Sequence, residues 1–171
     1  MRRQLIALGL ALCVGLAGCA SLARGVSTST ASTALGKPCP FANAVPQPTA
    51  EPAMLQAVRP YNSILDLPAF SRCVSDAARV QRLYAAALAL PPKGDRVYAC
   101  PKSWGITYQL IFLADGVIVG MMTQEADGCG FLHLSQTDIR LTDGPFRQQV
   151  ADTIGLPSLL PFGPPSGSGT T

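Results

Sequence analysis

The chain has 171 residues, which suits one domain with extended ends, and 48% of them are hydrophobic while only 13% are charged. Arg2 and Arg3 lie in an apolar leader, and the rest of the chain holds 11 basic and 10 acidic residues, a net charge of +1. Nucleic-acid-binding domains cluster basic residues on one face. The composition therefore excludes nucleic acid as a partner and points to no other.

Residues 1–18 have the three parts of an export signal. Arg2 and Arg3 make a positive start, an apolar stretch runs from Leu5 to Leu16, and small residues lead to Cys19. A helix that spans a membrane needs about 20 apolar residues, so this stretch is too short for a permanent anchor.

The segment Leu16-Ala17-Gly18-Cys19 resembles the lipobox of bacterial lipoproteins. The resemblance implies that the Cys19 thiol takes up a diacylglyceryl group, that signal peptidase II cuts before Cys19, and that an acyl group such as palmitate is added to the new amino group. At about 0.8 kcal/mol per buried CH₂, two or three chains hold a protein stably on a membrane. We therefore expect a cell-membrane lipoprotein on the extracytoplasmic face, with Cys19 as its lipid attachment site.

Three alternatives stay open for this leader. Ordinary signal peptidase cleavage after Ala23 gives a freely secreted protein, and an uncleaved apolar helix gives a different anchor. Arg2-Arg3-Gln4-Leu5-Ile6 also resembles the core of a twin-arginine signal, so export of the folded protein by that route is the third alternative.

The organisation beyond the leader follows from composition. Residues 19–37 are small, polar and rich in Ser and Thr, which predicts a flexible tether. Residues 38–158 form the predicted single domain, and residues 159–171 are a Pro-, Gly- and Ser-rich tail predicted to be disordered. Seven prolines between residues 38 and 70 predict an extended or loop-like arm laid across the domain, with at most a short turn at residues 54–58.

The remaining pattern alternates between strand and helix. A short strand is predicted over residues 70–74, with Ser75 as the N-cap of the helix that follows. Residues 80, 83, 84, 87 and 88 are apolar at three- and four-residue steps, and Pro91-Pro92 ends the helix.

Asp115-Gly116 is a strong hairpin signal between strands at residues 106–113 and 117–123, and a third strand is predicted near residues 130–134. A second short helix is predicted over residues 145–154. The expected fold is α+β: a small antiparallel meander of three to four strands, one main helix packed on it, a second short helix, and pinning disulfides.

Four cysteines lie beyond the leader: Cys39, Cys73, Cys100 and Cys129. An even number in an exported domain indicates disulfides, and four cysteines allow three pairings. Cys100 with Cys129 is favoured because the two flank the predicted hairpin, which leaves Cys39 with Cys73. Metal-binding spacing is missing, so no metal and no cofactor are expected.

These cysteines and their neighbours also resemble uncharacterised secreted proteins of actinobacteria. The shared features are Cys39-Pro40, Arg72-Cys73, Cys100-Pro101, Asp115-Gly116 and Gly128-Cys129, with the helix and the Tyr108–Phe112 strand between them. Those proteins carry no assigned activity, so this resemblance implies the fold and the disulfides alone.

No catalytic motif is recognisable, and His133 is the only histidine. It is interpreted as a packed or edge residue, Glu125 and Asp127 as parts of a solvated loop, and Trp104 with Tyr108 as core residues, with a small aromatic contact patch as the alternative. The sequence favours a non-catalytic binding or structural module of the envelope, with a protein, a glycan or a small ligand as the partner of a binding module. The alternative is a secreted enzyme of unrecognised type, which a pocket of convergent ionisable groups would support.

Overall fold

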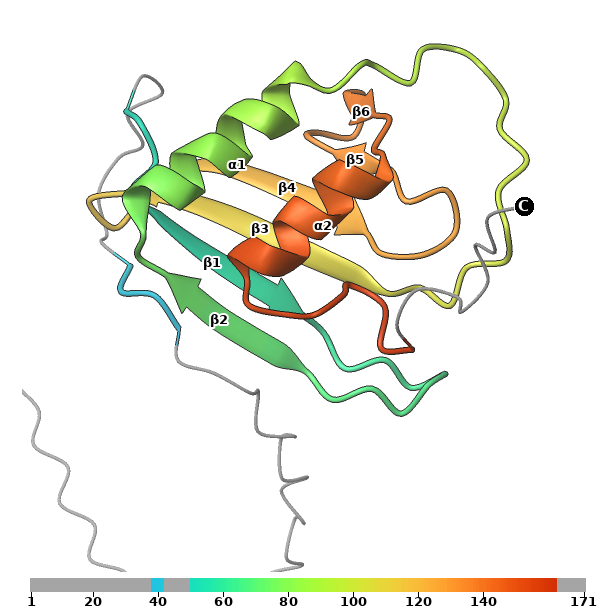
Figure 1. The fold of residues 1–171 in the computed structure, drawn as a ribbon, viewed down its shortest axis with the longest axis horizontal. Coiled ribbons are helices and arrows are strands. Elements are labelled where there is room, and N and C mark those ends of the chain that lie inside the picture. The colour runs from blue at the N-terminus through green and yellow to red at the C-terminus, as the bar shows by residue number, and fades with distance from the viewer. Residues whose placement is uncertain (1–37, 42–49, 163–171) are drawn as a thin grey trace, which may run out of the picture.

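Two helices lie against one face of an antiparallel sheet in the computed structural model, which describes residues 38–41 and 50–162 (Figure 1). The helices are α1 (Ala77–Ala89) and α2 (Gly144–Thr153). The strands are β1 (Met54–Arg59), β2 (Phe70–Val74), β3 (Thr107–Ala114), β4 (Val117–Glu125), β5 (Leu132–His133) and β6 (Ile139–Arg140). They lie in the order β2-β1-β3-β4-β5-β6. The α+β class is as expected, but the sheet has six strands rather than three or four.

Strand β1 is the main correction to the expected fold. The proline-rich arm was expected to cross the domain as a loop, whereas β1 pairs with β2 on one side and β3 on the other. Pro52 and Pro60 lie outside the strand ends, so their missing N–H groups do not interrupt either ladder. Leu55 and Ala57 are fully buried, and burial of these side chains is what holds a six-residue strand in the middle of the sheet.

The β3–β4 hairpin forms where the Asp-Gly signal predicts it. Asp115 has φ +50° and Gly116 has φ +79°, the two positive values that a type I′ hairpin turn requires. The register shifts between Phe112 and Leu113, where Gly120 and Ile118 of β4 are their partners, so β4 carries a bulge there.

Both helices begin at aspartate caps. Asp76, rather than the expected Ser75, caps α1 by accepting the Arg79 N–H at 3.0 Å. Asp143 caps α2 by accepting the Phe146 N–H at 2.8 Å. The buried face of α1 is narrower than the apolar pattern predicts, because Leu88, near the end of the helix, is 46% exposed.

The core fills the space between the helices and the sheet. It contains Tyr108, Leu110 and Phe112 of β3, packed against α1 and α2 residues. Leu159 is 4% exposed, and its carbonyl accepts the Tyr108 hydroxyl at 3.1 Å. The packed domain therefore extends past residue 158, which corrects the predicted start of the tail at residue 159.

Two disulfides join Cys39 to Cys73 and Cys100 to Cys129, each with a Cα–Cα distance of 4.9 Å. They are the two pairs that the hairpin argument favours. The first ties residues 38–41 to β2, and the Cys39 N–H also donates to the side-chain oxygen of Gln56 in β1. The second joins the segment before β3 to the loop after β4.

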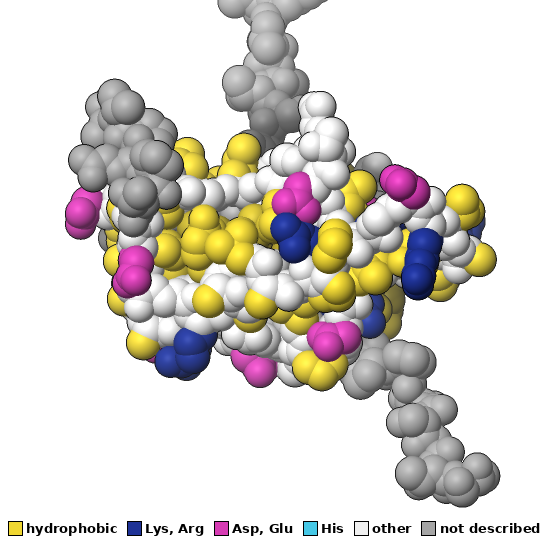
Figure 2. Space-filling view, turned by 90° about the horizontal axis from the view of Figure 1, so that it is seen from above, with side chains coloured by type: hydrophobic (Ala, Val, Ile, Leu, Met, Phe, Trp, Pro, Cys, Tyr) yellow, Lys and Arg dark blue, Asp and Glu magenta, His cyan; other side chains and the backbone are white. Residues whose placement is uncertain are grey.

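Two apolar side chains of β4 reach the surface. Ile118 is 39% exposed and Met121 is 58% exposed. Within the described residues β4 pairs with β5 only at Thr123 and Gln124, so its first half is not covered by β5. Figure 2, seen from above relative to Figure 1, shows a band of hydrophobic side chains with charged side chains scattered around it.

The predicted signal peptide, Cys19 and its tether, and residues 163–171 of the predicted tail lie outside the described residues. Among the residues that the structure describes, no helix combines the length and apolar character that a membrane crossing requires.

Candidate functional site

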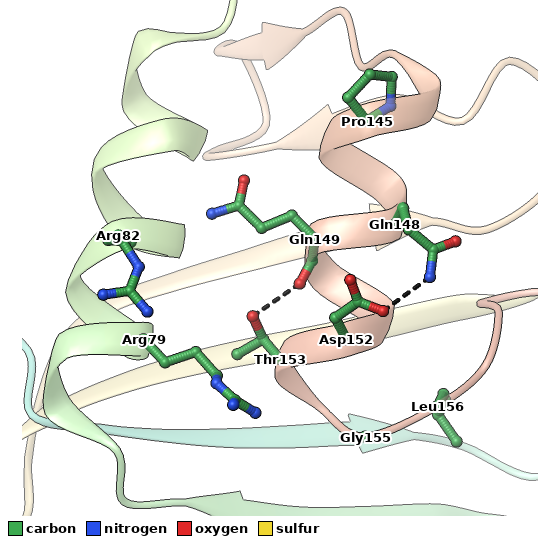
Figure 3. Close-up of a pocket in the computed structure, with 9 residues that line it drawn as sticks. All are labelled: Arg79, Arg82, Pro145, Gln148, Gln149, Asp152, Thr153, Gly155 and Leu156. Atoms are coloured by element: carbon green, nitrogen blue, oxygen red, sulfur yellow. Dashed lines mark hydrogen bonds between the residues drawn. The ribbon is translucent and has the colours of Figure 1, made fainter.

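A polar groove between the two helices is the first of two candidate sites (Figure 3). Arg79 and Arg82 of α1 face residues of α2 across a cavity of about 580 Å³. Its polar groups are largely engaged: Arg79 lies 3.7 Å from Asp76, and Gln148 donates to Asp152 at 2.8 Å. The arginine side chains of this groove are exposed, and no buried group holds them in one orientation. The groove therefore does not present charged groups in a fixed geometry to a ligand.

The second candidate, here called the sheet groove, opens on the sheet face opposite the helices. Tyr108 and Leu110 of β3 point into the core, so Thr107 and Gln109, which alternate with them, point to the other face. The cavity has a volume of about 440 Å³. Its lining residues are Thr107, Gln109, Met121, Thr123, Glu125, His133, Leu134, Ser135 and Gln136.

Strand register assembles this groove from three neighbouring strands. Gln109 of β3 is the partner of Thr123 of β4, and Thr123 is in turn the partner of His133 of β5. Thr107 and Glu125 form the next pair along β3 and β4. The groove thus has a row of three polar side chains with a second polar pair beside it.

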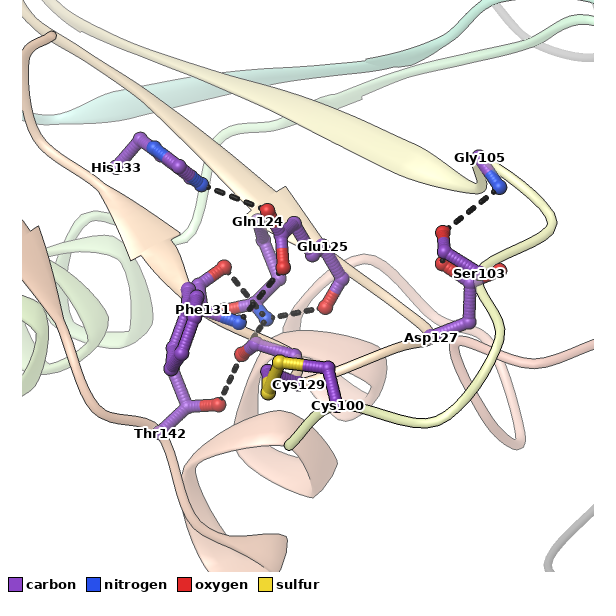
Figure 4. Close-up of polar contacts among 11 residues, drawn as sticks. Cys100, Ser103, Gly105, Gln124, Glu125, Asp127, Cys129, Phe131, His133 and Thr142 are labelled. Carbon is purple, nitrogen blue, oxygen red and sulfur yellow. Dashed lines mark hydrogen bonds and ion pairs between the residues drawn. A yellow bond between two sulfur atoms is a disulfide. The ribbon is translucent and has the colours of Figure 1, made fainter. Parts of the chain in front are cut away.

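Glu125 and His133 form an ion-pair-type contact within the groove (Figure 4). His133 Nε2 lies 2.8 Å from Glu125 Oε1, and the second carboxylate oxygen accepts the Phe131 N–H at 3.1 Å. The two side chains are 32% and 30% exposed, so the pair borders solvent. His133 is not at an edge of the sheet, because β5 pairs with β4 on one side and β6 on the other. The structure adds a carboxylate partner that the sequence does not predict.

A buried amide beneath the groove holds the segment that leads into β5 (Figure 4). Gln124 is fully buried on the core side of β4, and its Nε2 donates to the Gly130 carbonyl at 2.9 Å. The Thr142 hydroxyl donates to the same carbonyl. These bonds fix the segment just before His133 relative to β4. The groove residues of β4 and β5 are therefore held in place together.

Asp127 is not part of a solvated loop. It is 9% exposed, and its carboxylate accepts the Ser103 hydroxyl at 2.9 Å (Figure 4). The same carboxylate also accepts the Trp104 N–H. A buried carboxylate needs such donors because burial without them is costly. Asp127 therefore fastens the segment before β3 beside the Cys100–Cys129 disulfide, and does not join Glu125 in an acid–base pair.

The two aromatic residues near Cys100 have separate environments. Tyr108 is fully buried, as expected for a core residue, whereas Trp104 is 39% exposed and carries the Lys102 ammonium 5.1 Å from its ring centroid. The core interpretation is right for Tyr108 and wrong for Trp104.

The sequence predicts the polar strand faces that form the sheet groove, but not how the strands align. Polar residues alternate at Thr107 and Gln109 and again at Thr123 and Glu125, which predicts one polar face on each strand. Which of these residues become neighbours depends on the register between strands, which the alternating pattern does not predict.

The groove can hold a ligand through hydrogen bonds and one apolar contact surface. Across residues 38–41 and 50–162, no three side chains among His, Cys, Asp and Glu gather as a metal-binding set.

No protein-family model, curated protein or solved structure matches this chain.

Proposed function

We propose that this chain is an exported protein held on the extracytoplasmic face of the cell membrane by lipid on Cys19, with a domain that is a non-catalytic binding module of the envelope. The lipobox residues Leu16–Cys19 support the anchor. The sheet groove carries the binding proposal, because a disulfide-pinned sheet holds polar side chains around an open cavity of about 440 Å³.

Labelling with radioactive palmitate in intact cells tests the anchor. Full-length wild type is expected to take up label and to sediment with membranes, and Cys19→Ala is expected to lose both properties. Cys13→Ala is the matched control, because Cys13 is the other cysteine of the leader and lies inside its apolar stretch. Label retained by Cys19→Ala, or lost from Cys13→Ala alone, contradicts the proposal.

An enzyme is the second candidate function, and the Glu125–His133 contact is the observation that favours it. A histidine oriented by a carboxylate is the arrangement of a general base. Ser135 supplies a hydroxyl to the same groove, but its Oγ accepts the N–H groups of Thr137 at 3.2 Å and Asp138 at 2.9 Å. That hydroxyl stabilises a turn, which supports binding over nucleophilic catalysis.

Hydrolysis of p-nitrophenyl acetate separates these two functions. We expect wild type and His133→Gln to hydrolyse the ester at the same slow rate, with Ser135→Ala as a further comparison. A rate that falls at least tenfold in both variants would instead establish a hydrolytic site in the groove.

A further inference from the structure

We infer that the sheet groove binds a neutral ligand rich in hydroxyl groups, a short glycan segment. The inference rests on the proposed function, because it names the ligand class of the same groove. It follows from the charge, the hydrogen-bonding groups, their spacing and the apolar side of the groove.

The charge of the groove disfavours ionic ligands. Glu125 and His133 are the only ionisable residues that line it, and they contact each other at 2.8 Å. No lysine or arginine lines it, and the one imidazole already contacts a carboxylate, so a phosphate or carboxylate finds no free countercharge. A cationic ligand has to displace His133 from the Glu125 carboxylate. A neutral ligand disturbs neither residue.

The hydrogen-bonding groups of the groove are of the kind that sugar hydroxyls need. Among the side chains that line the groove, the hydrogen bonds within the described part of the chain belong to Glu125, His133 and Ser135. The polar side chains without one are those of Thr107, Gln109, Thr123 and Gln136. A threonine hydroxyl and a glutamine amide each donate and accept. A sugar hydroxyl also does both, so each of these side chains has a matching partner on a glycan.

The spacing of these groups suits a ligand of about disaccharide size. The row Gln109–Thr123–His133 crosses three strands. With strands about 4.8 Å apart it spans roughly 10 Å, and the Thr107–Glu125 pair lies about 6.8 Å further along the strands. The row and the neighbouring pair can together bond several hydroxyl groups of one ligand. A chain of sugar rings carries hydroxyl groups along its length and so can meet these side chains at the same time.

One side of the groove is apolar. Met121, 58% exposed, and Leu134 line it next to the polar row. Sugar rings have C–H faces that pack against such side chains while their hydroxyl groups bond to the polar ones. A fully polar ligand gains nothing from Met121, whereas a sugar ring uses both parts of the groove.

A peptide fits this groove less well. Extended peptides bind sheets mostly by adding to an edge, where main-chain groups are free to pair with them. The groove lies on the face of the sheet, where the backbone groups of β3 and β4 are already paired, so it offers side chains alone. A bound peptide leaves most of its own amides without partners there.

Saturation-transfer NMR on the full chain in detergent micelles tests the inference. The ligands are N,N′-diacetylchitobiose and maltose, with tetra-alanine and inorganic phosphate as competing chemistries. The test variant is Gln109→Leu/Thr123→Val, which keeps side-chain volume and removes two hydrogen-bonding groups. Gln148→Leu, which removes an exposed amide in the polar groove between the two helices, is the matched control. Unchanged far-UV circular dichroism establishes that the variants fold.

We expect saturation transfer to at least one disaccharide from wild type and from Gln148→Leu, with Kd raised about tenfold or more in the double variant. Absence of transfer to both disaccharides, or equal transfer from the double variant, overturns the inference. Groove-dependent binding of tetra-alanine or phosphate alone also overturns it, yet leaves the binding module standing. Palmitate labelling of Cys19→Ala tests the anchor separately.

Discussion

Tyr84 of α1 lies directly over Gly120 of β4, and a β-carbon added to Gly120 would lie 2.9 Å from Tyr84 Cε2. The same ring packs against Phe112 of β3, with centroids 4.8 Å apart. The helix approaches the hairpin this closely because β4 has no side chain at that point.

Substitution of Gly120 by alanine is therefore expected to destabilise the fold. The added methyl group forces the Tyr84 ring to move within a packed core, at a cost of about 1–3 kcal/mol in the free energy of unfolding. Urea denaturation of the oxidised protein measures this change.

Gly144→Ala is the matched control for this substitution. A β-carbon at Gly144, the first residue of α2, meets nothing within 4 Å, so the substitution is expected to be neutral or slightly stabilising. Equal destabilisation by the two substitutions would show that close packing under Tyr84 is not the cause.

Removal of the Asp127 charge is expected to loosen the segment before β3. Asp127→Asn offers one acceptor oxygen to the two donors on Ser103 and Trp104, so one of these two part-buried hydrogen bonds is lost. We expect a loss of about 1–3 kcal/mol in unfolding free energy and faster amide exchange at Trp104. Asp95→Asn, at an exposed position, is the control, and unchanged exchange at Trp104 would refute the role of Asp127.

Ionisation of Tyr108 is expected to destabilise the fold at high pH. Burial raises the pKa of the Tyr108 hydroxyl above its ordinary value of 10.0, and the nearby Arg59 guanidinium only partly opposes this. The unfolded chain therefore loses this proton at lower pH than the folded chain does. The stability held by neutral Tyr108 is fully present below pH 10 and is lost as pH rises from there through the folded-state pKa.

Urea denaturation between pH 8 and pH 11 measures this dependence. Tyr108→Phe is expected to flatten the decline in unfolding free energy above pH 10, although it lowers stability at pH 8 by removing the hydrogen bond to the Leu159 carbonyl. Tyr61→Phe serves for comparison, because Tyr61 is exposed and bonds Asp66 at the surface. A decline of the same steepness in Tyr108→Phe would assign it to other groups.

Loss of the Cys39–Cys73 disulfide is expected to free the arm before β1. The bond closes a loop with a sequence separation of 34 residues, so Cys39→Ala/Cys73→Ala should lose roughly 3–4 kcal/mol in the chain-entropy model. Denaturation in urea measures the loss, and peptide mapping without reductant checks the remaining Cys100–Cys129 bond. A peptide that joins Cys100 to Cys39 or Cys73 in wild type would contradict the pairing itself.

Local sequence determined the elements whose signals are short-range. Asp115-Gly116 specifies a turn with two positive φ values, and the α1 stripe followed by Pro91-Pro92 specifies a helix and its end. The exact start of α1 was not determined in this way. The sequence predicts Ser75 as the N-cap, whereas the N-cap in the structure is the next residue, Asp76.

Tertiary structure decided what depends on partners far along the chain. Residues 54–59 are a strand because β2 and β3 pair with both of their edges and bury Leu55, and prolines on both sides hide this in the sequence. The sheet groove likewise exists because register places His133 beside Glu125 and Thr123. The sequence alone marks these side chains as the polar faces of strands, since a strand pattern repeats every two residues and carries no information about which residue of a neighbouring strand it will oppose.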